Sequence, residues 1–104
     1  MTAQMTPLER LKRSYASAFL RYLARREEAS LHSGYELGRA AVESQLSVLQ
    51  LAQIHHDVLL EALQDNTDHD VTAVATAASE FFLEVLATFD MTSRGLLQSL
   101  ADNR

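Results

Sequence analysis

The sequence predicts an all-α protein, an antiparallel four-helix bundle with a long C-terminal helix. Two observations favour this fold. The chain of 104 residues contains only three glycines and one proline, too few for the many tight turns of a sandwich or barrel. Its apolar residues recur at three- and four-residue spacing in four successive segments. Because a chain of this length forms one core, we expect a single helical domain over 1–104.

The first predicted helix opens at Thr6-Pro7. Thr6 is a preferred N-cap, Pro7 suits the first helical position, and Glu9 occupies the acidic position of a capping box. The predicted apolar stripe consists of Leu8, Leu11, Tyr15, Ala18, Phe19 and Tyr22. The opposite side carries Arg10, Arg13, Arg21 and Arg25. The stripe fails at 25–28, so we place the boundary with the second helix near 27–30.

The second predicted helix begins with Ser30 as its N-cap and has a stripe of Leu31, Tyr35, Gly38, Val42 and Gln45. Gly34 and Gly38 lie four residues apart within it. Each glycine costs a helix interior about 1 kcal/mol. We therefore predict that a neighbouring helix of the bundle approaches closely here.

The third predicted helix covers about 48–64. Ser47 and Gln50 form a capping-box pattern, and Leu46 and Leu51 are placed for a hydrophobic staple around it. The predicted stripe consists of Val48, Leu51, Ala52, His55, Val58, Leu59, Ala62 and Leu63. Residues 65–68 follow as a predicted loop.

The fourth predicted helix covers 68–100, with Thr67 and Asp70 as a box-like start. One apolar stripe consists of Val74, Ala78, Phe81 and Val85. A second has the alternating spacing of a coiled-coil seam and consists of Ala75, Ser79, Phe82, Leu86, Phe89, Ser93, Leu96 and Leu100. A helix that is apolar over more than one face needs a second burial surface. The alternatives are a central helix in a monomeric bundle and, as we predict, a homodimer with Phe82, Leu86, Phe89 and Leu96 at the interface.

The length of this helix supports the same prediction. At 1.5 Å per residue it would measure about 50 Å, against about 25–30 Å for the others. We expect residues 91–104 to extend beyond the bundle as a linker-like end that needs a partner.

The charge is uneven along the chain. The formal net charge is −5, yet residues 1–26 carry six basic residues and one acid. The overall balance opposes a general nucleic-acid binder, because phosphate contact needs a basic face. The basic side of the first helix is typical of a solvated face, and contact with nucleic acid or a membrane surface is the alternative.

The sequence offers no motif for catalysis or for a cofactor. It contains no cysteine, which excludes disulfides, thiolate metal sites and cysteine nucleophiles. It has no phosphate-binding loop, no H-E-x-x-H pattern and no paired-carboxylate cleft. His55 lies on an apolar stripe, so we interpret it as a hydrogen-bonded packing residue. No apolar run approaches the roughly 18 residues of a membrane span, and the N-terminus lacks a signal-peptide pattern, so we expect a cytoplasmic domain.

The sequence resembles the N-terminal regulatory domain of RsbU-type serine/threonine phosphatases, the stress-response regulators of bacteria. The resemblance covers about residues 12–97. It rests on the order and spacing of Arg21-Tyr22-Leu23-Ala24, Ser30-Leu31, Ile54-His55, Val58-Leu59, Phe81-Phe82-Leu83-Glu84-Val85 and the segment 89–95.

The resemblance implies an antiparallel four-helix domain that dimerises, similar to the C-terminal domain of the cyanobacterial clock protein KaiA. It implies binding of a partner-switching kinase of the RsbT type, with the signal passed through a C-terminal helical linker to a phosphatase domain. That phosphatase dephosphorylates an anti-sigma-factor antagonist. The chain stops at Arg104, before any phosphatase domain, so we expect a regulatory domain that is not an enzyme and needs no cofactor.

Position by position, the resemblance implies a partner surface formed by the start of the second helix and a flank of the fourth. Its residues would be Leu31, His32, Tyr35 and Leu83. His32 stands where relatives carry an exposed aromatic residue, and Leu83 where they carry an aliphatic one. The partners expected are the kinase and a second copy, with no nucleic acid, membrane or small-molecule substrate. The alternative function is a free-standing dimeric adaptor, similar to KaiA, with a different protein partner.

Overall fold

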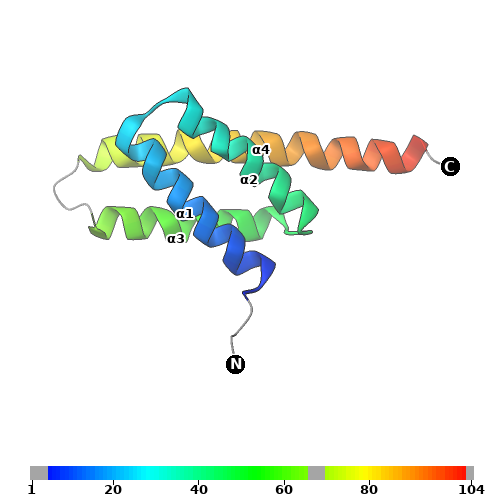
Figure 1. Ribbon diagram of the computed structural model, residues 1–104, viewed down its shortest axis with the longest axis horizontal. Helices are drawn as coiled ribbons and strands as arrows, with labels where there is room; N and C mark the ends of the chain where they lie inside the picture. The colour runs from blue at the N-terminus through cyan, green and yellow to red at the C-terminus, as the bar shows by residue number, and fades with distance from the viewer. Residues whose placement is uncertain (1–4, 66–69, 103–104) are drawn as a thin grey trace.

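The computed structural model describes residues 5–65 and 70–102 and confirms an all-α fold. Within these residues the chain forms four helices and no strand: α1 (Pro7–Arg25), α2 (Glu28–Glu43), α3 (Val48–Asp65) and α4 (Val71–Asp102). Figure 1 shows α3 and α4 running antiparallel, with α1 crossing them obliquely. The closest packing joins α2 to α4, whereas α2 and α3 barely meet. The order around the bundle is therefore α1, α2, α4, α3.

Local sequence signals determine most of the helix starts. The Thr6 Oγ1 atom accepts a hydrogen bond from the Glu9 N–H at 3.1 Å, as predicted for α1. At α3 the capping box is complete: the Gln50 N–H donates to Ser47 Oγ at 3.1 Å, and the Ser47 N–H donates to Gln50 Oε1 at 2.8 Å. The carboxylate of Asp70 accepts from the Thr72 N–H at 3.0 Å at the start of α4. The predicted cap at Thr67 lies outside the described residues.

The prediction for the start of α2 was wrong. Ser30 is the third residue of the helix, and Glu27 is the N-cap, without a side-chain hydrogen bond. α1 ends at Arg25, and its C-cap, Arg26, adopts the left-handed conformation with φ 57° and donates its N–H to the Tyr22 carbonyl. Because one left-handed residue turns the chain so sharply, α2 begins earlier than its stripe suggested.

The face that α2 buries also differs from the predicted one. Gly34, Leu37, Gly38 and Ala41 are buried, whereas the predicted Tyr35 is exposed. The two glycines explain the difference, since helices approach most closely where side chains are smallest. A Cβ on Gly38 would lie 2.6 Å from the Val85 carbonyl oxygen and 2.9 Å from the Phe89 nitrogen. The predicted close approach within the bundle is confirmed, and the helix concerned is α4.

The core is organised around Phe81 of α4. Its ring lies 5.2 Å from the Tyr15 ring in an edge-to-face arrangement, and 5.9 Å from the rings of Phe19 and Tyr22. The predicted first stripe of α4 is confirmed, because Val74, Ala78, Phe81 and Val85 are all buried. On α3 the buried residues are Leu51, Ile54, Val58 and Ala62, so Ile54 takes the place predicted for the exposed Ala52. The aromatic residues of α1 thus pack onto the middle of α4.

α4 extends beyond the other helices, as Figure 1 shows at its red end. Its 32 residues correspond to about 48 Å at 1.5 Å per residue. In the extension Leu96, Leu97 and Leu100 are all more than half exposed. We call residues 91–102 the overhang.

Candidate partner-binding surface

An aromatic and cationic column runs along the exposed side of α2. The rings of His32 and Tyr35 stack, with centroids 5.4 Å apart and planes 11° apart. The Arg39 guanidinium lies 6.0 Å from the Tyr35 ring centroid and donates a long hydrogen bond of 3.4 Å to its hydroxyl. These contacts follow from the i, i+3, i+7 spacing of the three residues. They hold both rings in place before any partner arrives.

A groove lies between the start of α2 and α4. It has a volume of about 260 Å³ and is lined by Glu28, Leu31, His32 and Glu84. Leu31 is half-buried and His32 is exposed. The structure therefore brings two of the predicted partner-binding residues to one groove. Tyr35 lies outside that groove, on the column.

Leu83 belongs to the outward face of α4. It follows Phe82 and precedes Glu84, and its side chain is 62% exposed. Glu84 lines the groove, whereas Leu83, about 100° further around the helix, does not. An aliphatic side chain this open to water gains free energy when a partner covers it.

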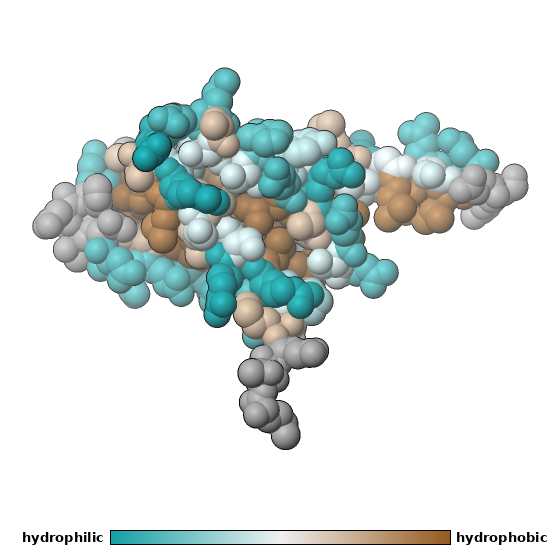
Figure 2. All heavy atoms as spheres, viewed as in Figure 1, coloured by the Kyte–Doolittle hydropathy of each residue, from teal (hydrophilic) through white to brown (hydrophobic). Residues whose placement is uncertain are grey.

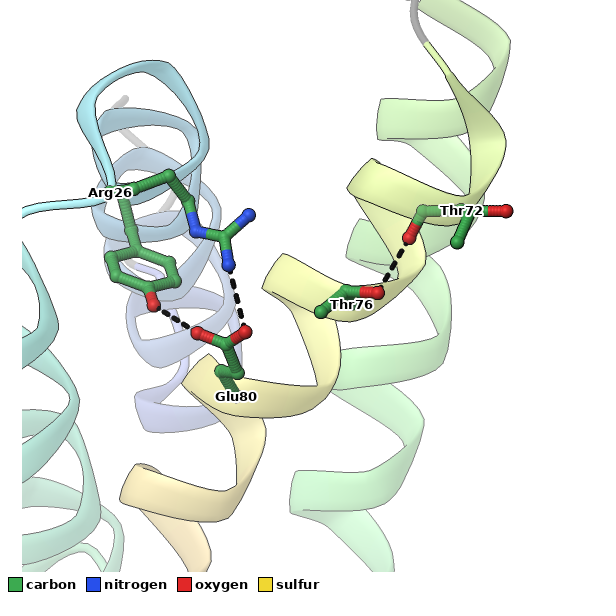
Figure 3. Close-up of polar contacts among 5 residues, drawn as sticks. Arg26, Thr72, Thr76 and Glu80 are labelled. Atoms are coloured by element: carbon green, nitrogen blue, oxygen red, sulfur yellow. Dashed lines mark hydrogen bonds and ion pairs between the residues drawn. The ribbon is translucent and has the colours of Figure 1, made fainter.

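Glu80, one turn before Glu84, ties α4 to the end of α1. Its Oε2 accepts a 2.6 Å hydrogen bond from the Tyr22 hydroxyl, and its Oε1 accepts a 2.8 Å hydrogen bond from Arg26 Nη2 (Figure 3). The hydrogen bond from Tyr22 lowers the pKa of the Glu80 carboxyl, and the charge of Arg26 adds to this. Burial raises the pKa of Tyr22. Each carboxylate oxygen of Glu80 thus accepts a hydrogen bond within the domain, whereas Glu84 lines the groove.

His55 is a packing residue, as predicted. Its ring lies flat on Phe82, with centroids 4.1 Å apart and planes 7° apart. Its Nδ1 lies 3.3 Å from the Tyr15 hydroxyl, a hydrogen bond from α3 to α1. Burial lowers the pKa of His55, and the neighbouring His56 lowers it further. His55 of α3 therefore contacts both α1, through Tyr15, and α4, through Phe82.

The residues predicted for the dimer interface divide into two groups. Phe82, Leu86 and Phe89 pack in part against the core of their own bundle. Leu96 lies on the overhang, which Figure 2 shows as a brown side standing apart from the rest of the molecule. The open part of the predicted interface is therefore the overhang.

α4 has the composition of a membrane span although it is largely a bundle helix. An 18-residue window of the helix reaches a mean hydropathy of 1.4. The sequence analysis did not find this segment because it considered only uninterrupted apolar runs. One such helix is weak evidence for a span, because core helices of soluble domains pass the same test. Val74, Phe81 and Val85 of α4 are buried against the other helices.

Other predicted features remain on the surface. Arg13, Arg21 and Arg25 on α1 are exposed, and within the described ranges they make no salt bridge. Residues 5–65 and 70–102 hold no group of three or more side chains suited to a metal ion.

The sequence analysis did not predict that Glu28 and Glu84 line the same groove. Glu84 is half-buried, whereas Glu80, one turn earlier, is exposed and hydrogen-bonded to Tyr22. The two glycines of α2 carried the missing signal. A Cβ on Gly34 would lie 3.2 Å from Glu84 Cγ, so the close approach of the helices also positions this carboxylate.

The fold places the chain in the class of all-helical four-helix domains. Within that class it belongs to the family described as phosphoserine phosphatase RsbU, N-terminal domain, whose profile matches residues 13–92. The family is a regulatory N-terminal domain of RsbU-type phosphatases, and the resemblance stated from the sequence is confirmed. Neither the curated proteins nor the solved structures provide a significant match.

Proposed function

We propose that this domain binds a switch kinase of the RsbT type and thereby controls an attached or associated serine/threonine phosphatase in a bacterial stress response. The kinase contacts Leu31, His32, Tyr35 and Leu83. The domain itself acts as a dimer, joined along α4, and contributes binding without chemistry. Family membership supports the regulatory role.

One observation carries the choice of surface: the His32 ring, stacked on Tyr35, lines a groove between α2 and α4, and Leu83 is exposed on α4. Aromatic rings held in place lose little conformational entropy on binding. An exposed leucine on α4 supplies the apolar side chain that interface centres need. The four residues come from α2 and α4, the pair of helices in closest contact.

Titration calorimetry with an RsbT-type kinase tests the proposal, using Leu83→Asp. An aspartate carboxylate in a desolvated contact costs several kcal/mol, so binding should weaken at least a hundredfold. Leu49→Asp is the matched control. Leu49 is 78% exposed and lies in the first turn of α3, where an acidic residue is favourable.

Circular dichroism separates loss of binding from loss of folding. Both variants should keep the helical spectrum of the parent, and Leu49→Asp should keep its affinity. Equal affinity of Leu83→Asp and the parent would remove Leu83 from the surface. Absence of binding by the folded parent would reject the kinase and favour the dimeric adaptor.

A further inference from the structure

Two acidic residues from different helices line one groove. Glu28 comes from the first turn of α2 and Glu84 from the middle of α4. Leu31 and the His32 ring form the rest of the lining. The groove therefore combines an aliphatic wall with two acidic groups.

Neither carboxylate is neutralised by the domain itself. The salt bridges within the described ranges involve Asp57, Glu80 and Asp90, and no hydrogen bond to Glu28 or Glu84 is found there. The start of α2 contributes about +0.5 charge from its helix dipole, against two full negative charges. The negative charges dominate, and the whole chain is acidic, with a formal net charge of −5.

The stem of Glu84 lies where α4 approaches α2 closely. Glu84 is half-buried, and its Cβ and Cγ lie 3.3 and 3.2 Å from the point where a Cβ on Gly34 would be. The nearby α2 backbone restricts the rotamers of this stem. A ligand therefore has only the end of the Glu84 side chain to order.

We propose that this groove accepts a basic side chain, arginine or lysine, from a protein partner. The aliphatic stem of that side chain packs on Leu31, and its cationic head lies between Glu28 and Glu84. The identity of the partner as a switch kinase rests on the proposed function, but the chemistry of the groove does not. Charge-assisted hydrogen bonds to two carboxylates make the contact selective for a cation over a neutral side chain of similar length.

The first experiment measures binding of the switch kinase to Glu28→Gln and Glu84→Gln. Glutamine keeps the stem that packs at Gly34 and removes only the charge. Each change should weaken binding about tenfold, the lower end of measured coupling for close interfacial charge pairs. Glu43→Gln is the matched control, because Glu43 is an exposed acid at the far end of the same helix.

The second experiment needs no kinase. N-acetyl-arginine amide and N-acetyl-lysine amide are titrated into the isotope-labelled domain, with N-acetyl-norleucine amide as the neutral control. The cationic probes should shift the amide signals of Leu31, His32 and Glu84, with millimolar affinity. The double variant Glu28→Gln/Glu84→Gln should lose these shifts and keep the rest of the spectrum.

The outcomes separate the two proposals. If Leu83→Asp abolishes kinase binding but both glutamine variants bind within twofold of the parent, the basic side chain is rejected and the proposed function stands. If no kinase binds, the proposed function fails, and the probe titration then decides whether the groove binds a basic side chain. Cationic probes that give no shifts at the groove, or the same shifts as the norleucine probe, overturn the inference.

Discussion

The backbone carbonyl oxygen of Val85 lies 2.6 Å from the point where a Cβ on Gly38 would be. α2 and α4 are therefore packed backbone to backbone at this residue. The atoms around Gly38 are largely main chain, which cannot rotate away as a flexible side chain can. This contact positions α2, which carries the proposed partner surface, on α4.

Gly38→Ala should lower the free energy of unfolding by about 1–3 kcal/mol, the usual cost of overpacking a core. Gly95→Ala is the control, since its Cβ would meet nothing within 4 Å. That change should raise the free energy of unfolding by up to about 1 kcal/mol, through helix propensity. Urea denaturation measures both. Equal effects of the two substitutions would contradict the packing described here.

Glu80→Gln should destabilise the domain by weakening the connection between α1 and α4. The variant loses the charge that pairs with Arg26 and accepts the Tyr22 hydroxyl less strongly. Because the Glu80 pKa is lowered in the folded state, its stabilising effect is present above the ordinary glutamate value and is lost as the pH falls through the folded-state pKa. Thermal unfolding should therefore show a larger difference between parent and variant at pH 7 than at pH 3. Asp90→Asn is the control, because its ion pair with Arg94 is solvent-exposed.

His55 should make stability depend on pH in a higher range. Its pKa is lowered by burial, so the unfolded chain takes up a proton first as the pH falls. The contribution of His55 to the free energy of unfolding is therefore largest above about pH 6.5. It decreases as the pH falls from that value to the folded-state pKa. His55→Gln should flatten the pH dependence in this window, as measured by urea denaturation. An unchanged slope in the variant would show that His55 does not carry it.

The overhang should mediate self-association. Light scattering at tens of micromolar should give about twice the chain mass of 11.6 kDa. Leu96→Lys/Leu100→Lys should give a folded monomer, because both leucines are exposed in the single chain. A parent that is monomeric at this concentration would reject the dimer. A variant that stays dimeric would show that the interface lies elsewhere on the domain.

Kinase binding should make the helical structure of the overhang more stable. Ser93 weakens the apolar seam, and Gly95 lowers helix propensity beside it, so residues 91–102 should exchange amide hydrogens quickly in the free domain. Binding near Leu83, two turns earlier, should slow that exchange. Hydrogen exchange of the domain with and without the kinase measures this. Full protection of the segment beforehand, or no gain on binding, would exclude transmission along α4.

Much of the fold could be predicted because its signals are local. The caps at Thr6 and Ser47 depend on residues three positions away, and the first stripe of α4 follows from helical periodicity alone. The face of α2 could not be predicted in the same way. Its rotation is determined by how closely α4 approaches Gly34 and Gly38, which is a property of two helices. The groove at Glu28 and Glu84 depends on that approach and was missed for the same reason.

The packing around Phe81 also determines when the chain can fold during synthesis. Tyr15, Phe19 and Tyr22 are made early, yet the ring they surround belongs to the last helix. A nascent chain whose α4 has not yet left the ribosome has no place to bury these three rings. Such a chain presents chaperones with an unfinished aromatic surface, and the release of α4 ends that exposure.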